Sequence, residues 1–167
     1  SIIVWHNLYG TKTMCRINEL GWIKKQFIEH NPDNLKESYI FTVDGKLLEY
    51  NGFQPLGLFD VETDALLRDS REDVDKCPPV ACCSCGCIEC DSVRTFVEFK
   101  DNFVAWTIFE ANICSDIESV MKENMGKYIF SKEQYLQAIN SLTEAVEKDE
   151  LISKQKKDSE WKKEIYG

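Results

Sequence analysis

The sequence predicts an α+β fold, in which two or more antiparallel β hairpins carry helices packed on one face. Three observations favour this class. Two segments alternate apolar and polar residues around short turns, as hairpin strands do. A later segment repeats apolar residues at helical spacing behind a capping sequence. The chain has 167 residues, of which 43% are hydrophobic, and this is enough for one core. We therefore expect residues 1–167 to form a single domain.

The N-terminal part of the chain predicts a strand followed by a helix. Residues 2–5 are a short apolar run that favours a strand. Beyond a loop, Ile17, Leu20, Ile23, Phe27 and Ile28 recur at helical spacing. Pro32 would end such a helix, because proline cannot continue the hydrogen-bond ladder.

Two hairpins are expected in the middle of the chain. Residues 39–43 and 46–50 flank Asp44-Gly45, a dipeptide that tolerates the positive φ of a tight primed turn. Residues 93–99 and 103–109 flank a second turn. Both arms of this second hairpin are rich in aromatic and β-branched residues, as a half-buried sheet requires.

A short helix and a last strand are expected next. Ser115 and Glu118 have the spacing of a capping box, so a helix is predicted to begin there and to end at Gly126. Residues 128–130 favour a strand.

The C-terminal segment predicts a long helix. Ser131 and Gln134 form a second capping box. The apolar stripe that follows is Tyr135, Leu136, Ile139, Leu142 and Val146. Residues 148–167 are strongly polar, and two interpretations stay open: a solvated helical extension or a frayed end, docked onto the body by Trp161 and Tyr166.

The most specific local pattern is a cysteine-rich loop, since five of the eight cysteines lie between Cys82 and Cys90. Thiolates favour zinc, and a structural zinc site needs four ligands. The candidate ligands are Cys83, Cys85, Cys87 and Cys90. Two other interpretations stay open. In the first, the thiols pack as small, buried, reduced side chains. In the second, one of them acts as a nucleophile beside a cation, for which Arg94 is the nearest candidate.

The same loop carries a resemblance to a group of small, largely uncharacterised bacterial proteins. Their shared pattern is a C-x-C-G-x-x-x-C loop followed by a V-x-W-x-x-F strand, which falls here on Cys83, Cys85, Gly86, Cys90, Val104, Trp106 and Phe109. The similarity spans about residues 39–140 and implies a shared fold and a cysteine site. This chain departs from the pattern at Glu89, where the group has glycine, and in its additional thiols Cys82 and Cys87.

The charge balance favours a basic protein partner. The formal net charge is −9, which would repel nucleic acid and anionic membrane surfaces. Carboxylates concentrate between residues 60 and 75, and they are the candidate partner-binding residues: Asp60, Glu62, Asp64, Asp69, Glu72, Asp73 and Asp75. The alternative interpretation of this segment is a solvated helix face.

Three functions follow, in this order. The first is a protein-binding inhibitor, specifically an immunity protein that neutralises a cognate bacterial toxin such as a basic nuclease. The second is a small zinc-binding structural or regulatory module, and the third is a thiol-dependent enzyme that uses the Cys82–Cys90 loop. The sequence has no nucleotide-binding or hydrolase motif, so the protein is expected not to be an enzyme. It begins without the basic region of a secretory signal, so a cytoplasmic location is expected.

Overall fold

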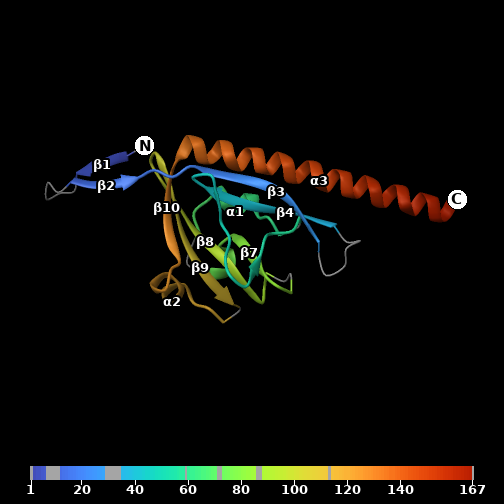
Figure 1. Ribbon diagram of the computed structural model, residues 1–167, viewed down its shortest axis with the longest axis horizontal. Coiled ribbons are helices and arrows are strands. Elements are labelled where there is room, and N and C mark those ends of the chain that lie inside the picture. The colour runs from blue at the N-terminus through green and yellow to red at the C-terminus, as the bar shows by residue number, and fades with distance from the viewer. Residues whose placement is uncertain are drawn as a thin grey trace.

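This computed structural model describes residues 2–6, 12–28, 35–58, 60–70, 73–85, 88–112 and 114–166. Within these ranges the chain forms three antiparallel sheets and one long helix (Figure 1). The predicted α+β class with antiparallel hairpins is confirmed.

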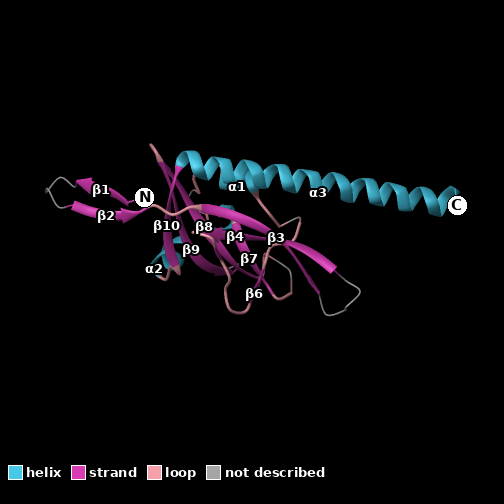
Figure 2. Cartoon of the chain, turned by 45° about the horizontal axis from the view of Figure 1, so that its top comes forward, coloured by secondary structure: helices cyan, strands magenta, loops and turns pink. Residues whose placement is uncertain are grey.

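The sheets differ in size. The two-stranded sheet pairs β1 (Ile2–His6) with β2 (Lys12–Arg16), and the three-stranded sheet has the order β3 (Leu20–Ile28), β4 (Leu35–Val43), β5 (Lys46–Leu47). The five-stranded sheet has the order β10 (Gly126–Ser131), β9 (Phe103–Asn112), β8 (Asp91–Lys100), β7 (Pro79–Cys83), β6 (Phe53–Gln54). The long helix α3 (Lys132–Tyr166) runs beside β3, and its C-terminal half extends past the sheets (Figure 2).

The helix predicted between Ile17 and Ile28 is wrong, because this segment is strand β3. It pairs with β4 in a regular ladder from Leu20 opposite Val43 to Ile28 opposite Leu35. Gly21 fits this pairing, since a Cβ there would lie 2.6 Å from the Thr42 hydroxyl oxygen. A glycine followed by the aromatic Trp22 and the β-branched Ile23 also opposes a helix.

Alternate positions of β3 bond to α3, and this tertiary contact explains why the strand forms. The backbone N–H of Leu20 donates to the side chain of Gln134 at 2.9 Å. Two residues on, the indole N–H of Trp22 donates to the Ser141 hydroxyl at 2.9 Å. After two more residues, Lys24 pairs with Asp149. The period of two belongs to a strand lying along a helix.

Both predicted hairpins are confirmed. Asp44 and Gly45 have φ values of 53° and 77°, as a primed turn needs. The arm after this turn is shorter than predicted, since β5 covers only Lys46–Leu47. The second hairpin is longer than predicted, because β8 and β9 pair from Lys100 and Phe103 at the turn to Asp91 and Asn112 at the open end.

The main core lies between α3, the three-stranded sheet and the five-stranded sheet. Trp106 is fully buried at its centre and makes edge contacts with Phe41 and Phe130. Its indole N–H donates to the Tyr135 hydroxyl at 3.1 Å, and that hydroxyl donates to the Leu66 carbonyl at 2.6 Å. The predicted helix stripe is confirmed, because Leu136 packs against this core and the other four members are buried: Tyr135, Ile139, Leu142 and Val146.

The short helices agree with the sequence in part. The acidic segment is partly helical, as predicted, with α1 at Thr63–Leu66 and the 3₁₀ turn η1 at Val74–Lys76. The predicted helix after residue 115 is α2 (Ile117–Lys122), but Asp116 caps it in place of Ser115. The Ser115 hydroxyl accepts instead from the backbone N–H of Asn112.

The polar C-terminal extension is helical as predicted, and it is not docked by its aromatic residues. Trp161 is 58% exposed and Tyr166 is 83% exposed. The apolar stripe of α3 ends at Val146, so the helix beyond it has no apolar face turned toward the body. Over the described ranges, no helix has the length and apolar character needed to cross a membrane.

Candidate metal centre

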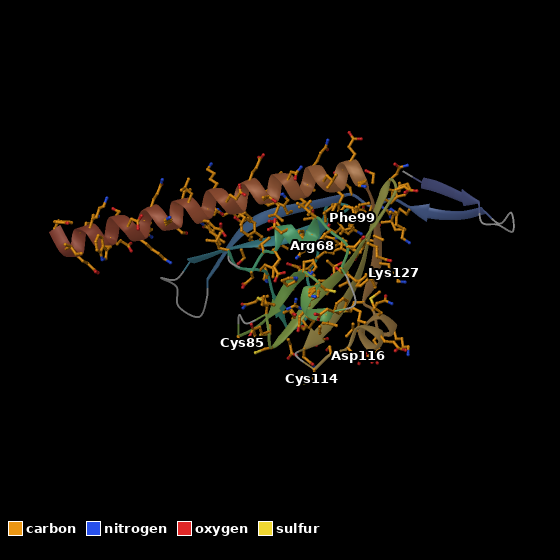
Figure 3. The ribbon with its side chains drawn as sticks, turned by 180° about the vertical axis from the view of Figure 1, so that it is seen from behind. Arg68, Cys85, Phe99, Cys114, Asp116 and Lys127 are labelled. Carbon is orange, nitrogen blue, oxygen red and sulfur yellow. The ribbon has the colours of Figure 1, made fainter. Side chains whose placement is uncertain are left out.

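The cysteine-rich loop joins β7 to β8 at the end of the molecule away from α3 (Figure 3). β7 is buried from Pro79 to Cys82 and becomes half-buried at Cys83. Because the ladder pairs Cys82 with Ser92, the two ends of the loop are held together at its base. This pairing brings Cys83 and Cys90, which lie just outside it, to the same place.

Three of the four predicted ligands meet in this loop. The sulfur atoms of Cys83, Cys85 and Cys90 all lie within 4.8 Å of one another. The Cys83 and Cys85 sulfurs are 2.6 Å apart. Cys87, the fourth predicted ligand, lies outside the described residues.

A tetrahedral thiolate site would require the Cys83 and Cys85 sulfurs, now 2.6 Å apart, to separate. Zinc–sulfur bonds of ~2.3 Å place ligand sulfurs about 3.8 Å apart. The three sulfurs therefore need shifts of about 1 Å to surround a zinc ion. Cys85 and Cys90 are exposed and Cys83 is half-buried, so the site is open to solvent.

Two neighbouring cysteines have a different role. Cys77 and Cys82 are buried, and each has its sulfur near a backbone carbonyl. Burial raises the pKa of both thiols to about 11. They are therefore protonated at neutral pH and act as small apolar side chains, which is the interpretation as buried, reduced thiols given above. Cys114 is exposed beyond the end of β9 and does not belong to the three-sulfur group.

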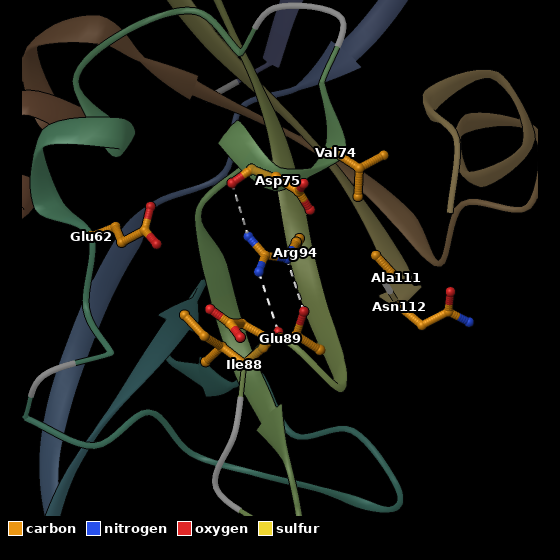
Figure 4. A pocket seen from close by; sticks show the side chains of 9 residues that line it. Glu62, Val74, Asp75, Ile88, Glu89, Arg94, Ala111 and Asn112 are labelled. Atoms are coloured by element: carbon orange, nitrogen blue, oxygen red, sulfur yellow. Dashed lines mark hydrogen bonds between the residues drawn. The ribbon is translucent and has the colours of Figure 1, made fainter. Parts of the chain in front are cut away.

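Arg94 connects the loop to the sheet (Figure 4). Its guanidinium donates to the Cys77 carbonyl at 2.7 Å and to the Ile88 carbonyl, inside the loop, at 3.3 Å. Its Nε donates to the Ser92 hydroxyl at 2.9 Å, and a longer bond of 3.5 Å reaches the Asp75 carbonyl. The side chain is only 6% exposed. One arginine thus joins three segments of the chain.

The sequence indicates the bridging role of Arg94 only through its position on the strand. Ser92, Arg94 and Phe96 share one face of β8, and the first two are buried. A charged residue at an inward position of a strand needs partners there. The partners themselves are backbone carbonyls, which the sequence does not reveal.

Carboxylates surround the cavity into which Arg94 projects. This cavity has a volume of about 400 Å³ and is lined in part by Glu62, Asp75 and Glu89 (Figure 4). It lies against the loop, since Ile88 and Glu89 form part of its wall.

The other candidate partner-binding carboxylates occupy different places. Asp60 accepts a hydrogen bond from the Gly57 N–H, and Asp69 accepts one from the Phe99 N–H. Asp73 caps η1 by accepting from the Asp75 N–H at 3.1 Å. Asp64 is exposed, and Glu72 lies outside the described residues. Three of these carboxylates therefore accept backbone N–H groups, and their role in partner binding stays a prediction.

Comparison with known proteins adds no relative: no protein-family model, no curated protein and no solved structure matches this chain.

Proposed function

We propose that this protein is a small binding module whose β7–β8 loop holds a zinc ion through the thiolates of Cys83, Cys85 and Cys90. The observation that carries this proposal is the convergence of their three sulfurs within 4.8 Å. Cys87 is the fourth ligand expected from the sequence.

The chemistry of the donor set supports zinc. Soft thiolates select zinc over magnesium or calcium, which prefer oxygen ligands. Structural zinc sites usually place two to four residues between paired cysteine ligands, whereas only Ser84 separates Cys83 from Cys85. Binding would displace the protons of the thiols, so occupancy is expected to fall as the pH is lowered.

Metal analysis of protein purified without chelator tests the proposal. We expect about one equivalent of zinc in the wild type and a large loss in Cys85→Ser and Cys90→Ser. Cys114→Ser is the matched control, because it removes an exposed thiol outside the three-sulfur group and is expected to keep its zinc. Less than about half an equivalent in the wild type, after reduction and zinc loading, would reject a zinc site.

A second candidate function is the binding of a basic protein, and the immunity role is its specific form. The observation that favours it is the shared cavity of Glu62, Asp75 and Glu89 on a chain of net charge −9. Complementary charge speeds association, which suits an inhibitor that must act before its target does damage.

Pull-down with the product of the adjacent gene tests this second candidate. Binding that Glu89→Lys weakens and high salt reduces would support it. If that product neither binds this protein nor is neutralised by it in cells, the immunity role is excluded.

A further inference from the structure

We propose that Arg94 is a positioning residue that holds the cysteine loop in its metal-binding shape before any metal arrives. This inference rests on the proposed zinc site and adds how that site is built. It predicts a preformed loop that takes up and releases a soft metal ion without refolding the protein.

Arg94 bonds to the half of the loop that carries Cys90. Between Cys83 and Asp91 the chain leaves the β7–β8 ladder, and its ends are held by the pairing of Cys82 with Ser92. The returning half of the loop carries Cys90. Arg94 donates to Ile88, two residues before Cys90, and so fixes this half from outside the ladder.

A second nitrogen of the same guanidinium bonds to the chain just before β7. Arg94 also donates to the carbonyl of Cys77, two residues before β7 begins at Pro79. The strand that delivers Cys83 and the turn that delivers Cys90 are thereby joined through one planar group. A guanidinium can do this because its donors diverge in a fixed fork, which a lysine ammonium lacks.

The three converging cysteines lie outside the apolar core. The two apolar clusters of the described residues contain Cys77 and Cys82, but none of the three converging cysteines. The apolar core therefore contains none of the three thiols, although Ile88 of the loop packs against it. This differs from small zinc domains, in which the metal supplies the folding free energy.

The experiment compares zinc affinity in four proteins, measured by competition with a chromophoric chelator at a temperature where all are folded. Arg94→Met is expected to bind zinc about 10–100-fold more weakly than the wild type, as is typical when a group supporting a metal ligand is lost. Arg94→Lys keeps the charge and is expected to lose most of the same affinity, since it cannot bridge the carbonyls. Val97→Ala is the control, because it opens a cavity in the same strand without touching the loop.

The comparison with Val97→Ala separates positioning from general stability. Both Arg94→Met and Val97→Ala are expected to lower the melting temperature of the metal-free protein. Only the Arg94 variants should also lower the increment in melting temperature that zinc adds. Equal zinc affinity in Arg94→Met and Val97→Ala would overturn the inference, and full affinity in Arg94→Lys would overturn the hydrogen-bonding fork as its cause.

A probe other than zinc keeps this test distinct from that of the proposed function. An aromatic arsenoxide bridges neighbouring thiols and reports their convergence directly. If the wild type binds no zinc but captures the arsenoxide about tenfold faster than Arg94→Met, the zinc function fails and the role of Arg94 stands. If the wild type binds neither zinc nor the arsenoxide, the three sulfurs do not converge, and both proposals are contradicted.

Discussion

At the scale of single residues, five of the cysteines whose exposure the structure describes fall into a buried and an exposed class, with Cys83 between them. Cys77 and Cys82 are buried, whereas Cys85, Cys90 and Cys114 are exposed. Burial penalises a thiolate, and it raises the pKa of the two buried thiols to about 11. A thiol reacts and binds metal as the thiolate, so the buried pair is chemically inert.

Alkylation of the reduced, metal-free protein tests this division. Iodoacetamide at neutral pH is expected to modify the exposed Cys85 and Cys114 much faster than Cys77 and Cys82, because burial shields the latter two and raises their thiol pKa to about 11. Mass spectrometry of timed samples gives the rates. Comparable rates at buried and exposed positions would show that the sheet does not protect Cys82. A single loop thiol reacting far faster than Cys114, together with substrate turnover, would favour the thiol-enzyme alternative.

Asp149 on α3 bonds to side chains of the three-stranded sheet. It accepts from the Tyr39 hydroxyl and from Lys24. Burial raises the pKa of Asp149, but the bonds from Lys24 and Tyr39 outweigh it, so the pKa lies below its usual 3.8. Lys24 also holds the pKa of Glu37 low through a 2.7 Å ion pair.

A lowered carboxylate pKa stabilises the fold at pH values above the unfolded pKa, and this contribution is lost as the pH falls through the folded pKa. Wild-type stability should therefore drop between about pH 5 and pH 3, and Asp149→Asn should show a shallower drop. At pH 7 the same variant is expected to be less stable by about 1–2 kcal/mol. Asp158→Asn, on the exposed part of α3, is the control and should match the wild type. Urea melts across this pH range decide the point, and parallel pH profiles for the wild type and Asp149→Asn would count against it.

At the scale of secondary-structure elements, local patterns were sufficient wherever one face of a segment meets the core. The turn at Asp44-Gly45, the β8–β9 hairpin and the apolar stripe of α3 all follow from period and turn chemistry. Strand β3 did not follow, because five apolar residues over a short span fit a helix as well as a strand. Gly21 was the local hint, and contact with α3 decided the outcome.

The convergence of the cysteines was predictable to a similar degree. Cysteine spacing indicated the loop in which the three sulfurs lie close together. It could not show that Arg94 fixes the loop, because the acceptors are carbonyls brought together by the β7–β8 register.

The two halves of α3 should differ sharply in their importance for stability. Leu142 is fully buried, so Leu142→Ala is expected to cost about 2–5 kcal/mol. Residues 151–166 are almost entirely exposed, and a chain ending at Glu150 should change the melting temperature by less than about 4 °C, which corresponds to less than 1 kcal/mol. Thermal melts followed by circular dichroism test both. A loss of several kcal/mol on truncation would show that Trp161 or Tyr166 docks after all.

At the scale of the whole molecule, the two apolar clusters of the described residues contain none of the three converging cysteines. Trp106, Tyr135 and their neighbours form the main core, and Ile88 of the loop packs against this cluster. The metal-free protein is therefore expected to unfold cooperatively in the presence of a chelator. Zinc at about 100 times its Kd should add about 2.7 kcal/mol to the free energy of unfolding. If the metal-free protein shows no cooperative transition in the presence of the chelator, the zinc site is needed for folding.

Native mass spectrometry of the reduced protein, titrated with zinc, tests the central claim most directly, because it counts both the metal ions gained and the protons lost. The account predicts one zinc per chain, gained with the loss of the coordinating thiol protons in the wild type and in Cys114→Ser, and no stable adduct in Cys85→Ser. A wild-type spectrum without a zinc adduct, or an adduct that survives unchanged in Cys85→Ser and Cys90→Ser, would contradict a metal site at the β7–β8 loop.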